Sequence, residues 1–247
     1  MKKTILITIL AMSFFLTMLF LPISNYVQGR NQNNVETTYV EAEYWWYESI
    51  EELTASATEI VRVEVLDERT ALHNRSLCVE YPSYEIVTIN RLLVIEIFAG
   101  NVQPGEVIEV VQTGGRLGNE EIINKDKVTF AFGDDLVLFM ESWRYIDGRP
   151  SVLISPRQGV YHINENSEPI ALPRNDLTLT RAMLEQIQQD SGIDSIILSP
   201  EEIESARIAA LNETTNLGLV IGIATGIVGL FTWIVFIWKR KKKKDKE

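Results

Sequence analysis

The clearest candidate for chemistry in this chain is a glycine-rich segment, Thr113-Gly114-Gly115-Arg116-Leu117-Gly118. Successive backbone N–H groups in such a loop can surround an anion, and the guanidinium of Arg116 would add charge and directed donors. A tight β-hairpin is the simpler interpretation of glycines at these positions. The segment therefore predicts either a ligand site formed by Arg116, Gly114 and Gly115 or a simple turn.

The remaining reactive side chains are few and scattered. His73 and His162 are far apart in the sequence, and the single cysteine, Cys78, excludes an intrachain disulfide. His73, Cys78 and Glu80 would form a nucleophile set only if the fold joined them, and a loop histidine beside a half-buried thiol is the simpler interpretation. No HExxH, CxxC, GxSxG, P-loop or GxGxxG motif occurs. The sequence therefore predicts no catalytic residue, no metal ligand and no cofactor.

Aromatic residues concentrate in one segment, Tyr44-Trp45-Trp46-Tyr47. One interpretation is that the rings pack the start of the next helix onto the domain. The other is an exposed patch in which Trp45 and Trp46 contact a ligand, a partner or the membrane interface. Ser49 followed by Glu52 forms a capping box, which predicts a short helix directly after the aromatic segment.

The elements that would position these residues are mainly strands. Hydrophobic residues alternate with a period of two from Ile60, and turn residues separate the later runs. Residues 67–78 are predicted to be a polar loop, and the long run 84–98 is predicted to bend near Asn90-Arg91. This pattern predicts a small antiparallel barrel or a sandwich, with strands over residues 61–66, 84–98, 107–112, 128–132, 136–141, 152–154 and 158–163.

Helical periodicity returns after Pro173. Leu179, Met183 and Ile187 share one helix face, and Gly192 is a natural stop. The sequence Ser199-Pro200-Glu201-Glu202 opens a second helix with a capping serine and a proline at the first position. These two helices predict a helical stalk over residues 174–216.

The two ends of the chain have the pattern of membrane segments. Residues 1–29 resemble a secretory signal with a basic start and an apolar run, which would form a second span if it is not cleaved. Residues 217–238 contain no charge and are long enough to cross a bilayer as a helix. The basic residues of the segment 239–247 would lie in the cytoplasm and contact lipid. The main domain is therefore predicted to lie outside the cell membrane.

Small residues recur every fourth position in the predicted span, at Gly218, Gly222 and Gly226. This spacing allows two membrane helices to approach closely. It predicts helix pairing, either in a homodimer or with another membrane protein, although glycine is also common in membrane spans.

The predicted outer part of the chain is acidic. Residues 30–216 contain 14 arginines and lysines against 32 aspartates and glutamates, a net charge of −18. This charge argues against nucleic acid as a partner, because phosphates require a basic surface. A cationic partner, or simple solubility at a cell surface, is consistent with it.

Several motifs in residues 53–163 resemble a domain of uncharacterised bacterial surface proteins. They are Ser56-Ala57, Ile60–Leu66, Glu96–Gly100, Ile108–Gly115, Phe132–Phe139 and Gln158–Tyr161. The pattern is distantly similar to the netrin-like domain of tissue inhibitors of metalloproteinases, which implies an OB-type barrel. Those inhibitors use an N-terminal cysteine and several disulfides, which this chain lacks, so their inhibitory mechanism is not implied.

Together these features predict one main domain, a β-barrel ectodomain with an N-terminal helix over residues 43–173. A signal segment and a linker over residues 30–42 precede it, and the stalk, the membrane span and the basic tail follow it. The expected function is a binding or interaction module of the bacterial cell envelope that is anchored in the membrane and contacts another envelope protein. An envelope hydrolase with a dispersed site remains an alternative. So does an accessory subunit of a membrane complex that docks through its span.

Overall fold

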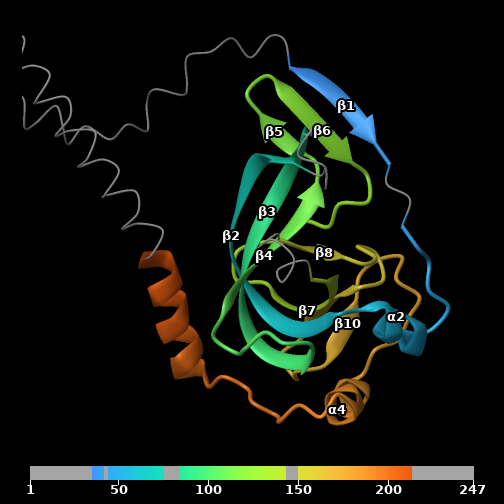
Figure 1. Ribbon diagram of the computed structural model, residues 1–247, viewed down its shortest axis with the longest axis vertical. Coiled ribbons are helices and arrows are strands. Elements are labelled where there is room, and N and C mark those ends of the chain that lie inside the picture. Colours follow the sequence, from blue (N-terminus) through green and yellow to red (C-terminus); the bar gives the residue numbers. More distant parts are fainter. Residues whose placement is uncertain (1–34, 42–43, 75–83, 143–149, 213–247) are drawn as a thin grey trace, which may run out of the picture. The chain divides into compact units, whose positions relative to one another are not determined.

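The computed structural model describes residues 35–41, 44–74, 84–142 and 150–212. Over these residues the protein is mainly β, as the alternating pattern predicted, with strands in two sheets and a few short helices (Figure 1). The elements are β1 (Glu36–Val40), α2 (Ile50–Ser56), β2 (Glu59–Asn74), β3 (Tyr84–Ala99), β4 (Val107–Thr113), β5 (Gly115–Leu117), β6 (Glu120–Asn124), β7 (Asp135–Glu141), β8 (Ser151–Leu153), β9 (Val160–Ile163), β10 (Pro169–Ala171) and α4 (Arg181–Asp190). Residues 200–212 are also helical.

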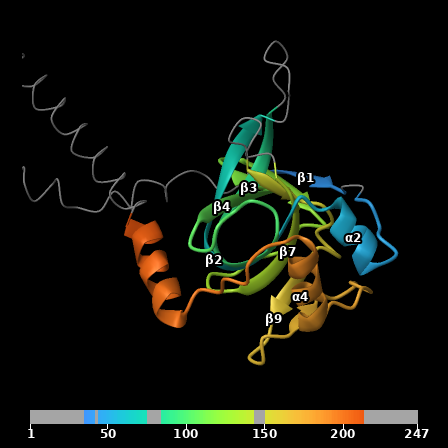
Figure 2. The ribbon, with the colours of Figure 1, turned by 60° about the horizontal axis from the view of Figure 1, so that its bottom comes forward.

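Five strands of the larger sheet pair in a closed circuit. The order β7-β2-β3-β4-β8 returns to β7, because β8 pairs with both β4 and β7. All of these pairings are antiparallel except the one between β4 and β8, which is parallel. Figure 2 views this ring of strands nearly end-on. The strands β9 and β10 continue the sheet beyond β7.

The interior of the circuit is filled by alternate residues of its strands. They are Val61, Val63 and Val65 of β2, Leu92 and Val94 of β3, Ile108 and Val110 of β4, Leu136, Leu138 and Met140 of β7, and Leu153 of β8. Each of these side chains is buried. Burying a side chain of this size contributes about 1.5–3 kcal/mol, so this cluster is a main source of stability.

A second core lies between the outer face of the sheet and two helices. Phe139 and Tyr161 pack against each other there, with ring centroids 6.1 Å apart. Leu53 of α2 and Leu184 of α4 complete the cluster, and both are fully buried. In Figure 2 both helices lie outside the ring of strands. The short helices are therefore held by packing, since helices of this length are marginal alone.

The helix starts follow the sequence signals. The Ser49 hydroxyl accepts a hydrogen bond from the Glu52 N–H at 3.2 Å, and the Glu52 carboxylate accepts one from the Glu48 N–H at 2.9 Å. At the second helix the Ser199 hydroxyl accepts from the Glu202 N–H at 3.3 Å, and the Glu202 carboxylate accepts from the Ser199 N–H at 2.8 Å, so this pair is reciprocal. The capping serines predicted at both helix starts are confirmed, and the reciprocal capping box is complete only at Ser199.

Two sequence predictions about strands are wrong. Residues 67–74 are not a loop, because β2 continues to Asn74 and pairs with β3 along this length. Residues 128–132 form no strand: the Gln112 side chain accepts from the Val128 N–H and donates to its carbonyl, at 3.0 and 3.1 Å. The side chain of Gln112 thus forms the two hydrogen bonds that a neighbouring strand would otherwise make with the backbone of Val128.

The smaller sheet contains β1, β6 and β5 in that order (Figure 1). Part of the segment predicted as a linker, residues 36–40, is therefore strand β1. The Lys125 N–H also donates to the Val40 carbonyl, at 3.3 Å. The described part of this segment is therefore tied to the domain by backbone pairing.

Helical residues 200–212 pack against the outer face of β2 and β3. Ala210 joins Leu66 and Leu93 in a small buried cluster. The Arg207 guanidinium donates twice to the Glu64 carboxylate, at 2.7 and 2.8 Å, and Arg91 donates to the Ala210 carbonyl at 3.3 Å. The described part of the predicted stalk is therefore in contact with the β domain, and its role as a stalk stays a prediction.

Candidate functional site

A cavity of about 370 Å³ lies against the outer face of β3, β4 and β8. The described residues that line it are Tyr44, His73, Glu85, Val87, Val111, Gln112, Thr113, Glu141, Pro150, Val152, Leu153 and Pro156. Its volume is within the usual range of small-ligand sites, and such a cavity is the default candidate for binding.

Strand register explains which side chains reach this cavity. The inward residues of β3 and β4 include Leu92 and Val110, so residues an odd number of positions away point outward. Val87 pairs with Thr113 across β3 and β4, and Val111 pairs with Val152 across β4 and β8. These outward residues form the floor of the cavity, which is mostly apolar.

The polar groups of the cavity come from the ends of the strands. His73 and Glu85 are register partners on β2 and β3, so their side chains share one face of the sheet. Glu141 is the last residue of β7 and pairs with Val152. The described lining thus contains two carboxylates and one imidazole but no lysine or arginine.

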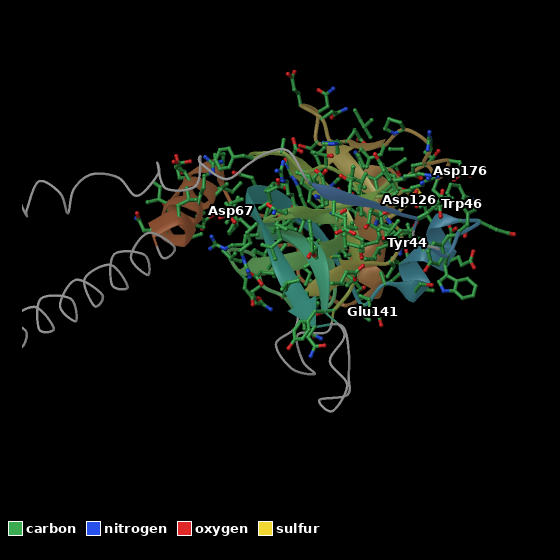
Figure 3. The ribbon with its side chains drawn as sticks, turned by 90° about the horizontal axis from the view of Figure 1, so that it is seen from above. Tyr44, Trp46, Asp67, Asp126, Glu141 and Asp176 are labelled. Atoms are coloured by element: carbon green, nitrogen blue, oxygen red, sulfur yellow. The ribbon has the colours of Figure 1, made fainter. Side chains whose placement is uncertain are left out.

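The aromatic segment predicted from the sequence begins at this cavity. Tyr44 lines it, whereas Trp45 and Trp46 are 81% and 51% exposed and Tyr47 is only 8% exposed. The segment therefore divides, because Tyr47 packs into the second core and the two tryptophans face solvent. Figure 3 shows Tyr44, Trp46 and Glu141 on one side of the domain and Asp67 on the other, beside helical residues 200–212.

A buried glutamine fixes the backbone of the aromatic segment. The Gln158 side-chain amide accepts from the Tyr47 N–H at 2.8 Å and donates to the Tyr47 carbonyl at 2.9 Å. It also donates to the Asp176 carboxylate at 3.1 Å. With the Ser49 cap directly afterwards, the chain on one side of Trp45 and Trp46 is held firmly. Such a fixed backbone presents exposed rings at a low entropic cost.

The glycine-rich segment lies elsewhere, in a β-hairpin. Gly114 and Gly115 have φ angles of +107° and +143°, and a Cβ on Gly115 would lie 2.8 Å from Thr70 Cγ2. The Gly114 N–H donates to the Ile86 carbonyl at 3.0 Å, so this donor is already used inside the protein. Arg116 is exposed on β5 opposite Glu121.

The structure therefore does not bring all of the predicted site residues together. Arg116, Gly114 and Gly115 belong to the hairpin that the sequence allowed as the alternative, and none of them lines the cavity. An anion site around Arg116 stays a prediction. Gly218, Gly222 and Gly226, predicted for helix pairing, lie outside the described residues, and so do Cys78 and Glu80.

Three arginines pair with carboxylates on the β domain, in the pairs Arg62–Asp135, Arg181–Glu96 and Arg207–Glu64. Hydrogen bonds to these carboxylates raise the pKa of each arginine above its usual value. The three pairs join β2 to β7, α4 to β3, and helical residues 200–212 to β2. Their role is to hold elements together.

Two other groups have shifted pKa values because they are buried. Burial lowers the pKa of Lys127, whose ammonium donates to the Thr88 hydroxyl at 2.7 Å. Burial raises the pKa of Tyr161 to about 12, and its hydroxyl donates to the Leu177 carbonyl at 3.3 Å. Neither residue lines the cavity, so these shifts reflect packing and do not mark a reactive centre there.

Among the described residues, no three His, Cys, Asp and Glu side chains are placed to hold a metal ion. No helix in the described part of the chain is both long and apolar enough for a membrane span, and the predicted span 217–238 lies outside that part. Comparison of the chain with protein families, curated proteins and solved structures finds no match.

Sequence reasoning missed Glu85 and Glu141 as site residues, and it noted Tyr44 only as part of an aromatic run. No motif marks these residues, because Glu85 and Glu141 come from strands β3 and β7 and Tyr44 from the segment before α2, and they meet only in the folded protein. The sequence did contain one signal: Glu85 and Val87 are two positions apart on the long strand, so their side chains point to the same face of the sheet. This signal identifies site residues only when the neighbouring strands are known.

Proposed function

We propose that this protein is a membrane-anchored, extracytoplasmic binding module with an OB-type barrel, and that its ligand occupies the cavity on β3, β4 and β8. The observation that carries this proposal is the position of the cavity. It lies on the outer face of the second and third strands of the five-strand circuit, between the ends of β2 and β7. OB-type barrels bind their ligands on that face.

The strand order supports the OB-type assignment. In such a barrel three strands follow one another in antiparallel order, and the fifth strand pairs with the third and the fourth. Here β2, β3 and β4 are the first three strands, β7 is the fourth and β8 is the fifth. The parallel contact between β4 and β8 is the pairing that closes this arrangement.

The aromatic segment supports a binding role for the same region. Trp45 and Trp46 follow Tyr44 directly, and aromatic rings are enriched at interfaces because they bury large areas with few rotatable bonds. An exposed pair on a fixed backbone is hard to explain by folding alone, since neither ring contributes to the core. It extends the cavity toward a macromolecular partner.

The anchoring part of the proposal rests on the sequence. The apolar segments at residues 1–29 and 217–238 and the basic tail at 239–247 support an extracytoplasmic domain with a single C-terminal span. Only four residues separate the described helical residues from the start of that segment. A helix docked on β2 and β3 would then hold the barrel close to the membrane surface.

The test is a crosslinking capture from intact membranes with the full-length protein as bait. Val111→Trp would fill the cavity from its floor, and Leu117→Trp, on exposed β5, is the matched control. We expect the control and the unchanged protein to recover the same partner and Val111→Trp to lose it, with unchanged thermal unfolding. Equal recovery by all three would show that the cavity is not the site. Recovery by a bait without residues 40–195 would assign the interaction to the membrane helix.

An envelope hydrolase is the second candidate, because His73, Glu85 and Glu141 line one cavity and could share acid and base roles. If the protein is a hydrolase, the unchanged protein should cleave the captured ligand, and the Glu141→Gln variant should bind the ligand without cleaving it. A ligand recovered unaltered from both would leave only the binding role.

A further inference from the structure

The lining of the cavity combines outward-facing valines with two carboxylates, Glu85 and Glu141, and this combination selects a ligand class. Resting on the proposed function, we propose that the cavity binds a basic polypeptide segment by taking up a lysine or arginine side chain. Such side chains lay an apolar stem along hydrophobic surface and keep the charged head at its polar edge.

The floor matches the stem of such a side chain. Val87, Val111 and Val152 face outward from three neighbouring strands, and Pro150 and Pro156 add apolar surface beside them. Contact with these groups removes the methylene carbons of a lysine or arginine from water, which favours binding in proportion to the apolar area that is buried. A ligand that is polar over its whole length would gain nothing from this floor.

The two carboxylates of the lining match the charged head. Glu85 and Glu141 lie at the ends of β3 and β7, and the described lining contains no basic side chain except His73. Elsewhere in the described chain seven arginines and lysines form ion pairs, namely Arg62, Arg69, Arg91, Lys125, Arg157, Arg181 and Arg207. Most of the described basic groups are thus already engaged with carboxylates of the protein itself, and residues 30–216 carry a net charge of −18.

The aromatic segment adds a second attraction for cations. Tyr44 lines the cavity, and Trp45 and Trp46 are exposed directly after it. A lysine or arginine over such a ring is stabilised by the negative face of the π-system, most strongly with tryptophan. A segment with several basic residues could place one in the cavity and a neighbour against Trp45 or Trp46. An acidic or neutral segment would be repelled or gain neither contact.

The experiment uses the full chain in detergent micelles and a fluorescein-labelled lysine oligomer, with the same oligomer acetylated on its side chains as the uncharged probe. Binding is followed by fluorescence anisotropy at increasing NaCl concentration. The test variant is Glu85→Gln with Glu141→Gln. The matched control is Glu120→Gln with Glu165→Gln, which removes the same charge at exposed positions outside the cavity. Thermal unfolding of each variant checks that the domain remains folded.

We expect the unchanged protein to bind the lysine oligomer and not the acetylated one, with affinity that falls as salt rises. The test variant should bind about tenfold or more weakly, because each partly exposed ion pair contributes up to about fivefold. The control should stay within about twofold of the unchanged protein, since distant surface charges are screened. Absence of binding, or an equal loss in the control, would overturn the proposal. If Val111→Trp still abolishes partner capture in that case, the cavity remains the site and only its ligand class is wrong.

Discussion

Removing Arg181 tests how α4 is held on the sheet. Glu96 is 0% exposed on β3, and the Arg181 guanidinium donates to its two carboxylate oxygens at 2.7 and 2.6 Å. The guanidinium carbon of Arg181 also lies 5.5 Å from the centre of the Phe98 ring. The substitution Arg181→Met keeps the apolar stem and removes all of these polar contacts. It leaves the Glu96 carboxylate buried without its partner.

The size of the effect follows from this burial. Breaking a buried ion pair by removing one partner costs about 3–5 kcal/mol. The Arg181 side chain is 20% exposed, so water can partly replace it, and we expect the lower end, about 3 kcal/mol. For a domain of this size that loss lowers the unfolding temperature by roughly 6–12 °C.

The assay is urea unfolding of the full-length protein in micelles, followed by circular dichroism, for Arg181→Met and for the double substitution Arg181→Met with Glu96→Leu. The double variant should recover most of the loss, because replacing both charges with apolar groups leaves nothing unpaired. Arg181→Lys should be intermediate, since lysine keeps the charge but not the paired geometry. A loss below about 1 kcal/mol in the single variant, or a double variant as unstable as the single, would refute this reasoning.

Three further substitutions test other parts of the structure. Burial raises the pKa of Tyr161 to about 12, so between pH 10 and 12 the unfolded state releases a proton that the folded state keeps. The free energy of unfolding should therefore fall by about 2–3 kcal/mol over this range in the unchanged protein and not in Tyr161→Phe. Unfolding free energies measured across this pH range check it, and an equal fall in both proteins would contradict it. Ser151→Ala should raise stability by about 1 kcal/mol, because the Ser151 hydroxyl is buried and has no hydrogen-bond partner. A loss of stability in thermal unfolding would show that the hydroxyl is satisfied in solution. Gln158→Leu should cost about 2–3 kcal/mol by leaving the buried Tyr47 N–H and carbonyl unpaired, and it should increase the mobility of Trp45 and Trp46. Tryptophan fluorescence anisotropy measures that mobility, and an unchanged value would show that other contacts fix the segment.

Local signals in the sequence predicted the local structure well. Both capping serines and the long strand 84–98 were readable because short-range hydrogen bonding and alternation specify them. The failures occurred where a distant partner decides the structure. Residues 67–74 look polar and loop-like, yet pairing with β3 makes them a strand, and the side chain of Gln112 takes the place of a strand partner at Val128.

The aromatic segment shows the same limit within four residues. Composition treats Tyr44 to Tyr47 as one cluster, whereas the structure buries Tyr47 and exposes Trp45 and Trp46. The residue that separates them is Gln158, more than a hundred positions away, which takes both backbone groups of Tyr47. Its contribution could not be predicted from the sequence, because an isolated glutamine carries no pattern.

A single bulge decides which residues form the candidate site. Along β2 the odd-numbered residues Val61, Val63 and Val65 point into the circuit. Val65 pairs with Leu92 and Asp67 with Arg91, so Leu66 is an extra residue on this strand. Beyond it the parity reverses: Thr70 lies opposite Thr88 on the inward face, and His73 lies opposite Glu85 on the outward face. The sequence predicted a bend near Asn90-Arg91 on β3, whereas the extra residue, Leu66, lies opposite this point on β2. That difference matters, because without the extra residue on β2 an odd-numbered residue such as His73 would point inward, away from the cavity.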